Sequence, residues 1–487
     1  MKPTSAVSAV LLGGLAALVA SLGWRSLAWP LIHDAPIMHY IAWRITEGAA
    51  PYRDLFDMNA PGVYLLHLAV LRFGGPGDLA WRAFDLAWLA SGALAVGALA
   101  APWGLVAAAG GGLFFAVHHL AGGAWQAGQR DFLLCPLLLL GALGVARWLE
   151  CPRQATSLAW GGLALGASIT IKPHAALFAA ALGLVVLVGA WRAGAALPAT
   201  IFVAGVALPL LAVVGWMAAL GALPAWRAVA LDYLVPLYSR LGRPVPWGFH
   251  RWQAWIPVGV AVALSLGSAA AHRRFTPRHG IAALGLAYGV VHYVGQGKGW
   301  EYHVYPLAAF AAVLLFSELE PMLRSRRWVA GALLAGNLAA LGLLFGAKGV
   351  EAGDAEWIRD KERRVSAVVR ELGGRLGPGD LIQVLDTSEG GVHALLRLRA
   401  VQPTRFLYDF PLFHDPSAPA VQRLRAEFLR DLGRRPPRFI VLFRRGWPAG
   451  GAERVETFPE LHRHLAAAYR LHAQGDGYIV YAKQDDS

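Results

Sequence analysis

The sequence contains little cysteine and little charge. Its two cysteines, Cys135 and Cys151, are too few and too poorly placed for a disulfide framework, so they leave the redox compartment open. Only 15% of the 487 residues are charged, whereas 56% are hydrophobic and 19 are tryptophan. The sequence also lacks an internal repeat and a glycine motif in the strand-to-helix context that nucleotide binding needs. This composition predicts a polytopic membrane protein.

Charge is distributed unevenly along the chain. Residues 1–350 carry 23 Lys and Arg and 12 Asp and Glu, whereas the shorter segment 351–487 carries 21 and 19. The surroundings of the chain therefore change from lipid to water near residue 350. This change predicts a transmembrane domain over 1–350 and a soluble domain over 351–487. The net charge of +13 lies mostly in the first part, which indicates contact with membrane lipids or phosphates and no nucleic-acid partner.

Hydropathy predicts about eleven transmembrane helices in the first domain. The apolar run after Lys2 is long enough for a full crossing, so we interpret it as the first span rather than as a cleaved signal peptide. Lys172-Pro173-His174 interrupts a long apolar block and indicates a turn between two spans. The expected spans are 6–31, 79–101, 103–120, 131–148, 157–171, 174–190, 196–219, 252–271, 280–296, 303–318 and 327–346.

The segment after residue 350 has the pattern of a small α/β domain. Three predicted helices, at 354–373, 419–433 and 458–473, each precede a predicted strand, at 381–385, 438–443 and 478–482. With a cytoplasmic N-terminus and an odd number of spans, this domain lies outside the plasma (inner) membrane. The resulting fold class is a polytopic α-helical membrane protein with a C-terminal extracytoplasmic α/β domain.

The loop 32–78, which follows the first span, concentrates acidic residues near the membrane. A carboxylate at the bilayer centre costs about 2.5–3.5 kcal/mol on insertion scales and less near the surface, so such a polar loop usually marks a site. After Asp34, apolar residues recur at helical spacing and stop before Gly48. This spacing predicts a short amphipathic helix on the membrane surface.

Several short segments carry a resemblance to a known family. In the loop they are Asp34 with Tyr40, Gly48-Ala-Ala-Pro51-Tyr-Arg-Asp54 and Asp57-Met-Asn-Ala-Pro61-Gly-Val-Tyr64. Further along the chain they are Gln129-Arg130-Asp131, Lys172-Pro173 and Gly295-Gln-Gly-Lys-Gly-Trp-Glu-Tyr-His-Val-Tyr-Pro306. Together they resemble the bacterial GT-C glycosyltransferases related to protein O-mannosyltransferases and to the aminoarabinose transferase of lipid A.

The resemblance implies a GT-C-like fold and a glycosyltransferase. Such an enzyme moves a hexose or pentose from a polyprenyl-phosphate-linked donor to an extracytoplasmic glycolipid, polysaccharide or protein of the cell envelope. An inverting transfer needs a base for the proton of the acceptor and cations that stabilise the departing phosphate. Asp34 is the candidate base, and Asp131 would orient the acceptor or assist Asp34. The expected contacts to the donor phosphate are Arg130, Lys172, Lys298 and His303.

Further substrate contacts are expected from Arg53, Asp57, Asn59 and Tyr302. Relatives often have Lys-Pro-Pro where this chain has Asn59-Ala60-Pro61, so Arg53 or Lys298 would have to replace that basic contact. Whether a divalent metal joins Asp34 and Asp131 is left open, because neither residue has a local metal-ligand spacing.

Each candidate residue also has a purely structural interpretation. Asp34 is placed to cap the helix that begins at Ala35, and Asp131 could form an ion pair with the adjacent Arg130. Lys172 and Lys298 could extend to lipid headgroups. Arg82 and Asp85, three residues apart on a helix, are interpreted as a structural pair.

Two other classes of protein compete with a single-sugar transferase. A transporter or flippase for lipid-linked glycans usually places ionisable residues near the middle of the membrane. This chain places its charges mainly at span ends, which favours an enzyme. A polymerase or ligase of surface glycans would use the same kind of donor, and the sequence does not separate it from a transferase.

Overall fold

The structure is a computed structural model that describes residues 3–241, 255–326, 328–353 and 355–484. The chain forms two compact units. Unit 1 comprises Met1–Pro30, Gly77–Val214 and Gly242–Asp354. Unit 2 comprises Leu31–Pro76, Gly215–Leu241 and Ala355–Ser487. The loop that follows the first span therefore belongs to the same unit as the C-terminal tail.

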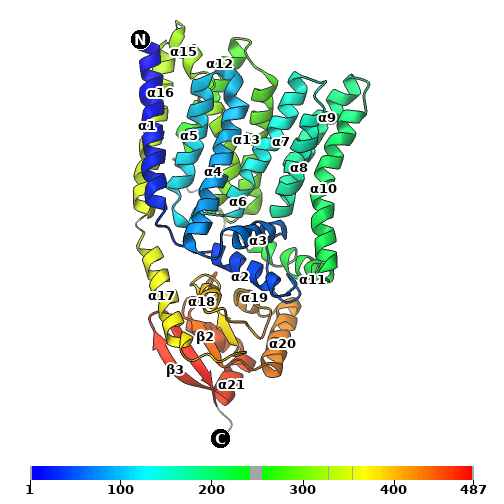
Figure 1. Cartoon of the computed structure of the whole chain (residues 1–487), viewed down its shortest axis with the longest axis vertical. Coiled ribbons are helices and arrows are strands. Elements are labelled where there is room, and N and C mark those ends of the chain that lie inside the picture. The colour runs from blue at the N-terminus through cyan, green and yellow to red at the C-terminus, as the bar shows by residue number, and fades with distance from the viewer. Residues whose placement is uncertain (1–2, 242–254, 327, 354, 485–487) are drawn as a thin grey trace. The chain divides into compact units, whose positions relative to one another are not determined.

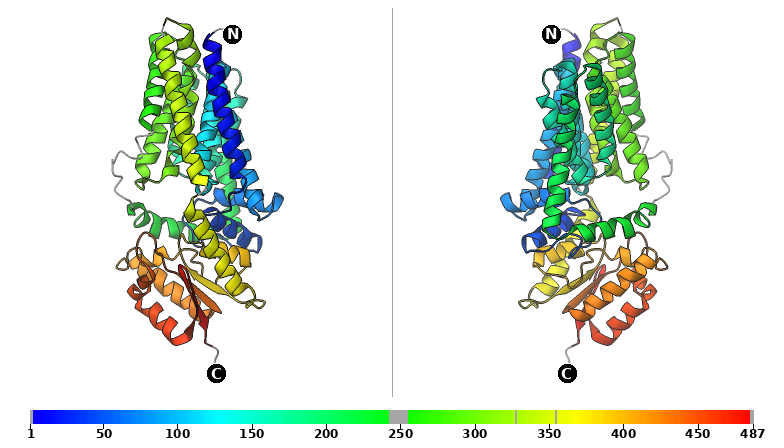
Figure 2. Two further views of the ribbon diagram at one scale, coloured as in Figure 1. Left: turned by 90° about the vertical axis from the view of Figure 1, so that its left-hand side faces the viewer. Right: turned by 90° about the vertical axis from the view of Figure 1, so that its right-hand side faces the viewer.

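Unit 1 is a bundle of apolar helices that run side by side (Figures 1 and 2). Its longer helices are α1 (Pro3–Ser26), α4 (Asp78–Ala100), α5 (Leu105–Ala121), α7 (Cys135–Glu150), α8 (Thr156–Ile171), α9 (Ala175–Arg192), α10 (Leu197–Ala219), α12 (Trp255–Ala271), α13 (Pro277–Gln296) and α16 (Trp328–Gly353). Shorter elements are η1 (Ala101–Trp103), η2 (Ala124–Gln126), α6 (Arg130–Leu133), η5 (Glu301–Val304), α14 (Tyr305–Leu315) and α15 (Leu319–Arg324).

The predicted class of helical membrane protein is confirmed. Each expected span contains a helix within the described residues, and the first residues of two spans, 252–254 and 327, lie outside them. The predicted break at Lys172-Pro173-His174 is also confirmed, because α8 ends at Ile171 and α9 begins at Ala175. By length and composition, 7 helices among the described residues can cross a membrane. The count of eleven crossings stays a prediction.

Close helix packing in unit 1 depends on small residues. A Cβ atom at Gly144 of α7 would lie 2.5 Å from the carbonyl oxygen of Ser157 and 2.9 Å from the Cα atom of Gly161, both on α8. Such distances leave no space for a side chain, so the backbones of α7 and α8 approach each other directly.

Unit 2 contains more helix than the sequence predicted. The loop forms α2 (Ala35–Thr46), as expected, and also α3 (Gly62–Phe73), which was not predicted. In α3 the side chains of Val63, His67 and Val70 are buried at helical spacing. The segment after α10 forms α11 (Leu223–Ala228), the π-helical turn η3 (Val229–Leu234) and η4 (Tyr238–Arg240).

The tail of unit 2 is built around a four-stranded sheet with the strand order β1-β2-β4-β3. Its strands are β1 (Ile382–Leu385), β2 (Phe439–Phe443), β3 (Tyr469–Gly475) and β4 (Tyr478–Lys483). Its helices are α17 (Glu356–Gly373), α18 (Gly391–Leu398), α19 (Phe410–Phe413), α20 (Pro419–Arg434), η6 (Ala452–Thr457) and α21 (Pro459–Ala468). Helix α17 lies on one face of the sheet, and α20 and α21 lie on the other (Figure 2).

The register of the sheet explains its buried core. Strands β1 and β2 are parallel, with Ile382 opposite Phe439, and every residue of both strands is buried. Strand β4 pairs antiparallel with both β2 and β3. A continuous apolar run such as β2 is typical of a strand that is covered on both faces.

The predicted helix 458–473 is wrong in its last five residues, 469–473. Helix α21 ends at Ala468, and Tyr469–Gly475 forms β3, which pairs with β4 across a turn at Asp476-Gly477. Gly477 has a φ of +83°, a conformation that glycine adopts readily. An Asp-Gly dipeptide between two alternating segments is a hairpin signal, and this pairing overrides the helical pattern.

Contacts within unit 2 fix the loop to the tail. The backbone N–H of Phe56 donates to the carbonyl oxygen of Arg405 at 2.7 Å, and the rings of Phe56 and Phe406 stack with centroids 5.6 Å apart. The hydroxyl of Tyr40 donates to the carbonyl oxygen of Ala400 at 3.1 Å. The segment 31–76 is therefore folded into unit 2 together with the tail and is not merely a linker between two helices.

Candidate functional site

A fully buried carboxylate, Asp131, is the centre of a polar cluster in unit 1. It lies at the start of α6, where the chain turns at Gly128 with a φ of +69°. The ammonium of Lys172, just after α8, donates to both oxygens of Asp131 at 2.8 and 2.6 Å. Lys172, which the sequence had assigned to the donor phosphate, is thus a direct partner of Asp131.

Three side chains of α13 complete this cluster. The Nε2 atom of His292 lies 2.5 Å from Oδ1 of Asp131, and the hydroxyl of Tyr288 lies 3.2 Å from the Nδ1 atom of His292. The amide nitrogen of Gln296 donates to Oδ1 of Asp131 at 3.3 Å. An ionised carboxylate has no donors, so the ammonium, imidazole and amide groups satisfy its acceptor sites.

The surroundings of Asp131 carry an excess of positive charge. Burial lowers the pKa of Lys172 to about 8, the carboxylate of Asp131 opposes that shift, and the charges of Arg130 and Lys298 add to it. Burial also lowers the pKa of Lys298. Arg130 and Lys298, which the sequence assigned to a donor phosphate together with Lys172, thus lie near enough to oppose the charge of Lys172.

The aromatic segment around η5 contributes the other expected residues of unit 1. Tyr302 and His303 are buried, and their rings meet edge to face with centroids 4.8 Å apart. The His303 ring also lies 5.5 Å from the ring of Trp300 and 6.4 Å from that of His292. The structure therefore brings His303 to the neighbourhood of the Asp131 cluster.

A second buried cluster in unit 1 contains Arg82 and Asp85, which form the predicted pair. Arg82 forms an ion pair with Asp85 inside the bundle and donates to the hydroxyl of Ser26. Asp85 also lies 2.9 Å from the Nε2 atom of His119 and accepts from the backbone N–H of Gly128 at 2.9 Å. This cluster fixes the turn from which α6 and Asp131 begin.

Asp34, the candidate base, lies in unit 2. It occupies the N-cap position of α2, but its side chain makes no capping hydrogen bond. Its carboxylate is 29% exposed and lies 3.8 Å from the Nε2 atom of His33. The capping interpretation of this carboxylate therefore finds no support in its geometry.

The other three expected residues of unit 2 take part in contacts within the loop. Asp57 is fully buried and accepts from the hydroxyl of Tyr64 at 2.6 Å and from the amide of Asn59 at 2.9 Å. Arg53 is half exposed, forms a bidentate pair with Asp54 at 3.0 and 2.8 Å, and donates to the carbonyl oxygen of Leu220 at 3.2 Å. Asp57 and Asn59 therefore shape the loop, whereas the guanidinium of Arg53 faces solvent.

His292 was not predicted from the sequence, and its contact with Asp131 joins α13 to α6. Histidine and glutamine at positions 292 and 296 share one face of a helix, and Gln296 belongs to the Gly295–Pro306 string. That spacing was the available signal. Among the described residues, no group of three or more His, Cys, Asp or Glu side chains is arranged to hold a metal ion.

The fold is similar to that of known membrane glycosyltransferases. One is ArnT from Cupriavidus metallidurans bound to undecaprenyl phosphate, with a TM-score of 0.65 and 13% identity over 97% of this chain and 98% of that chain. The apo state of that protein has a TM-score of 0.58 and 13% identity over 96% and 97%.

A third similar structure is the archaeal oligosaccharyltransferase AglB from Archaeoglobus fulgidus in complex with an inhibitory peptide and a dolichol-phosphate. Its TM-score is 0.54, with 11% identity over 99% of this chain and 74% of that chain. No protein-family model matches the sequence, and no curated protein matches it. ArnT and AglB both belong to the GT-C superfamily, so the predicted GT-C-like fold is confirmed.

Proposed function

We propose that this protein is an inverting glycosyltransferase that uses a polyprenyl-phosphate-linked sugar as donor. The observation that carries the proposal is the Asp131–Lys172–His292 cluster, a buried carboxylate among cations, in a fold shared along nearly its whole length with a protein bound to undecaprenyl phosphate. A bare phosphate needs cationic and N–H donors, and this neighbourhood supplies them.

In the proposed reaction, a hydroxyl oxygen of the acceptor attacks the anomeric carbon of the sugar. The bond between that carbon and the phosphate oxygen breaks, and its electron pair leaves with the lipid phosphate. Asp34 takes the proton of the acceptor hydroxyl, and Asp131 orients the acceptor or assists Asp34. Arg130, Lys172, Lys298 and His303 stabilise the negative charge that develops on the phosphate.

The remaining residues have supporting roles in this proposal. Arg53 replaces the basic contact that relatives place at the position of Asn59, and its exposed guanidinium suits that role. Asp57 and Asn59 hold the shape of the loop, and Tyr302 lines the site beside His303. The enzyme lies in the plasma membrane with unit 2 on the extracytoplasmic side, where polyprenyl-linked donors and envelope acceptors meet.

Transfer of a whole glycan is the second candidate function, since the fold also resembles an oligosaccharyltransferase over 99% of this chain. Both functions would release a lipid phosphate. They differ in the mass that the acceptor gains. Mass spectrometry of the modified acceptor separates them, because one sugar and one oligosaccharide give different mass increments.

The decisive experiment is the substitution Asp34→Asn. Because the Asp34 side chain makes no capping hydrogen bond, asparagine should preserve α2 while removing the base. The assay measures release of undecaprenyl phosphate from synthetic donors that carry one pentose or one hexose, with an envelope extract as acceptor. General-base catalysis is typically worth about 10²–10⁴-fold, and we expect activity to fall by about that factor.

Glu47→Gln, at the exposed other end of α2, is the matched control and should retain full activity. Thermal stability of both variants should equal that of the wild type. If Asp34→Asn retains more than about half of the wild-type activity, the loss is far too small for a missing base, and this assignment of Asp34 is refuted. Failure of the wild type to release undecaprenyl phosphate from either donor would refute the choice of donor class.

A further inference from the structure

Helix α17 places a lysine where its pattern calls for an apolar side chain. The buried face of this helix consists of Ile358, Lys361, Val365, Val368 and Leu372, which recur every three or four residues. Lys361 is only 6% exposed. A buried charge is costly unless it is paired, and natural sequences break such a pattern mainly at functional sites.

The ammonium of Lys361 contacts the residue directly before the candidate base. Its Nζ atom lies 3.3 Å from the Nδ1 atom of His33, and it lies over the ring of Trp357 at 5.4 Å from the centroid. The rings of His33 and Trp357 meet edge to face, 6.2 Å apart. Trp357 and Lys361, four residues apart on α17, thus both contact the imidazole of His33.

This contact determines which nitrogen of His33 carries the proton. An ammonium group has donors and no acceptor, so Nδ1 must accept and Nε2 must carry the hydrogen of the neutral ring. The Nε2 atom faces Oδ1 of Asp34 at 3.8 Å. Such contacts often shorten when substrate binds.

The backbone at His33 is also unusual. Its φ is +64°, a left-handed conformation that is uncommon outside glycine. Strain of this kind persists where the surroundings enforce it, and it is frequent at functional sites. Here it turns the imidazole toward both Lys361 and Asp34.

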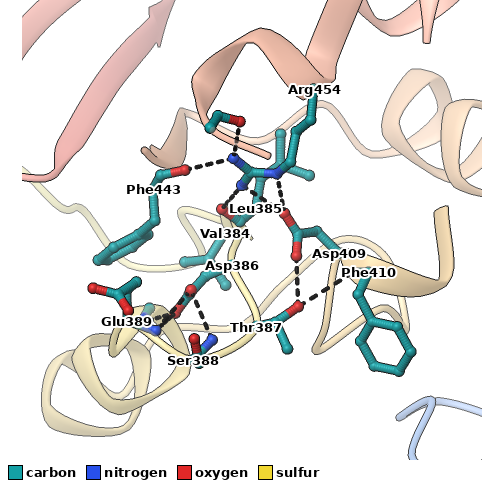
Figure 3. Close-up of polar contacts among 12 residues, drawn as sticks. Val384, Leu385, Asp386, Thr387, Ser388, Glu389, Asp409, Phe410, Phe443 and Arg454 are labelled. Carbon is teal, nitrogen blue, oxygen red and sulfur yellow. Dashed lines mark hydrogen bonds and ion pairs between the residues drawn. The ribbon is translucent and has the colours of Figure 1, made fainter. Parts of the chain in front are cut away.

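The other charged groups near Lys361 are engaged elsewhere. Asp386 accepts hydrogen bonds at 2.7–3.1 Å from the backbone N–H groups of Ser388–Gly391 (Figure 3). Glu389 pairs with Arg364 at 2.7 Å. Burial, with the charges of Arg397 and Lys361, lowers the pKa of His393 to about 3, so that ring stays neutral near pH 7.

We propose that Lys361 and His33 are positioning residues for Asp34. Lys361 holds His33 in its Nε2–H tautomer, and that N–H orients the Asp34 carboxylate and stabilises its ionised form. The inference rests on the proposed function, because it assigns a role to the neighbours of the proposed base. It also gives the C-terminal tail, which supplies Lys361, an indirect part in the reaction.

The test compares pairs of substitutions at each position. Lys361→Met keeps the length of the side chain and removes its donor, whereas Lys361→Gln keeps an N–H donor without charge. His33→Leu removes the imidazole, whereas His33→Gln keeps an N–H near the position of Nε2. Arg363→Gln, on the exposed face of the same helix, is the control. All variants enter the undecaprenyl phosphate release assay described for Asp34→Asn.

We expect Lys361→Met and His33→Leu to lower kcat by about tenfold to a hundredfold, with KM of donor and acceptor changed less than twofold. The acid limb of the pH–rate profile should move to higher pH, because the carboxylate loses the N–H that stabilises its ionised form. The two glutamine variants should recover at least half of the loss. Thermal stability of Lys361→Met should be unchanged or higher, because a buried charge is removed.

The opposite pattern would overturn the proposal. A merely structural lysine predicts that Lys361→Met loses stability and activity in parallel, with an unmoved pH profile and no benefit from glutamine. Nitrogen-15 NMR of labelled histidine gives a readout independent of activity, with the His33 signal assigned by its loss in His33→Gln. The wild type should show the Nε2–H tautomer and Lys361→Met a mixture, and identical spectra would refute the inference.

This readout separates the two hypotheses. If Asp34→Asn retains activity while the tautomer changes as expected, the assignment of the base fails and the structural pairing stands. If Asp34→Asn is inactive while the Lys361 and His33 variants behave like the wild type, only the positioning role fails.

Discussion

Lys172 and the buried Asp131 form a pair in which one ammonium donates to both oxygens of one carboxylate, at 2.8 and 2.6 Å. The two residues are 41 positions apart and come from the end of α8 and the start of α6. Removing one partner of a buried pair leaves an uncompensated charge, which typically costs about 3–5 kcal/mol. The pair therefore fixes the relative positions of these helix ends as well as the charge of the site.

The first prediction concerns the pH dependence of activity. Burial lowers the pKa of Lys172 to about 8, so its ammonium loses a proton as the pH rises through that value. The site then loses a positive charge, and kcat/KM for the donor should decline above about pH 8. Arginine stays charged in this range, so Lys172→Arg should remove the alkaline limb even where its overall activity is lower.

Lys298→Arg is the control for this assignment, because burial lowers the pKa of Lys298 as well. The alkaline limb should remain in that variant. If it disappears with Lys298→Arg and persists with Lys172→Arg, the titrating group is Lys298 and the prediction for Lys172 is wrong.

The second prediction concerns the cations that act on the donor. Lys298→Gln and Arg130→Gln should each raise the KM of the lipid-linked donor by about tenfold or more, because a charge-assisted contact to phosphate is lost. The KM of the acceptor should change little. Arg153→Gln, an exposed arginine in an expected inner loop, removes the same charge outside the site and should leave both constants unchanged. Equal changes for donor and acceptor in the first two variants would contradict a role at the donor phosphate.

The third prediction tests the turn that leads to Asp131. A Cβ atom at Gly128 would lie 1.8 Å from the Cζ2 atom of Trp81, and the φ at this position is +69°. Overpacking typically costs about 1–3 kcal/mol and a left-handed conformation about 1–2 kcal/mol, so Gly128→Ala should suffer both effects. Thermal unfolding in detergent should show a clear loss of stability.

Gly194→Ala is the matched control, because Gly194 has a φ of +62° and no atom within 4 Å of the Cβ position. Gly194→Ala should lose only the stability that a left-handed backbone conformation costs an alanine, without the loss from overpacking. Equal melting temperatures for the two alanine variants would mean that Trp81 does not close the space beside Gly128.

The fourth prediction concerns topology. Unit 2 contains both the loop and the tail, so the two must lie on the same side of the membrane, and we expect the outer side. In a Cys151→Ser background, exposed sites at Glu47→Cys in the loop and Arg463→Cys in the tail should react with an impermeant maleimide when the plasma membrane is intact. Arg153→Cys should react only after permeabilisation. Labelling of Arg153→Cys in intact cells, or of only one of the other two sites, would show that the span count or orientation is wrong.

The sequence by itself determined the features that depend on neighbouring residues. Hydropathy and helical spacing located α2 and the break between α8 and α9, because burial of a periodic apolar face is a local property of the chain. The spacing of Arg82 and Asp85 was sufficient to predict their pairing for the same reason. The helix predicted over 458–473 failed where the pairing of β3 with β4 outweighed local propensity.

Only the tertiary structure decided which charged groups meet. The carboxylate of Asp131 contacts Lys172 and His292, which lie 41 and 161 positions further along the chain. Likewise, the sequence placed Asp34 in a loop, but the contact between His33 and Lys361 exists because the tail packs on that loop. Such partners are selected by how helices and loops pack in three dimensions, where burial favours the pairing of every charge.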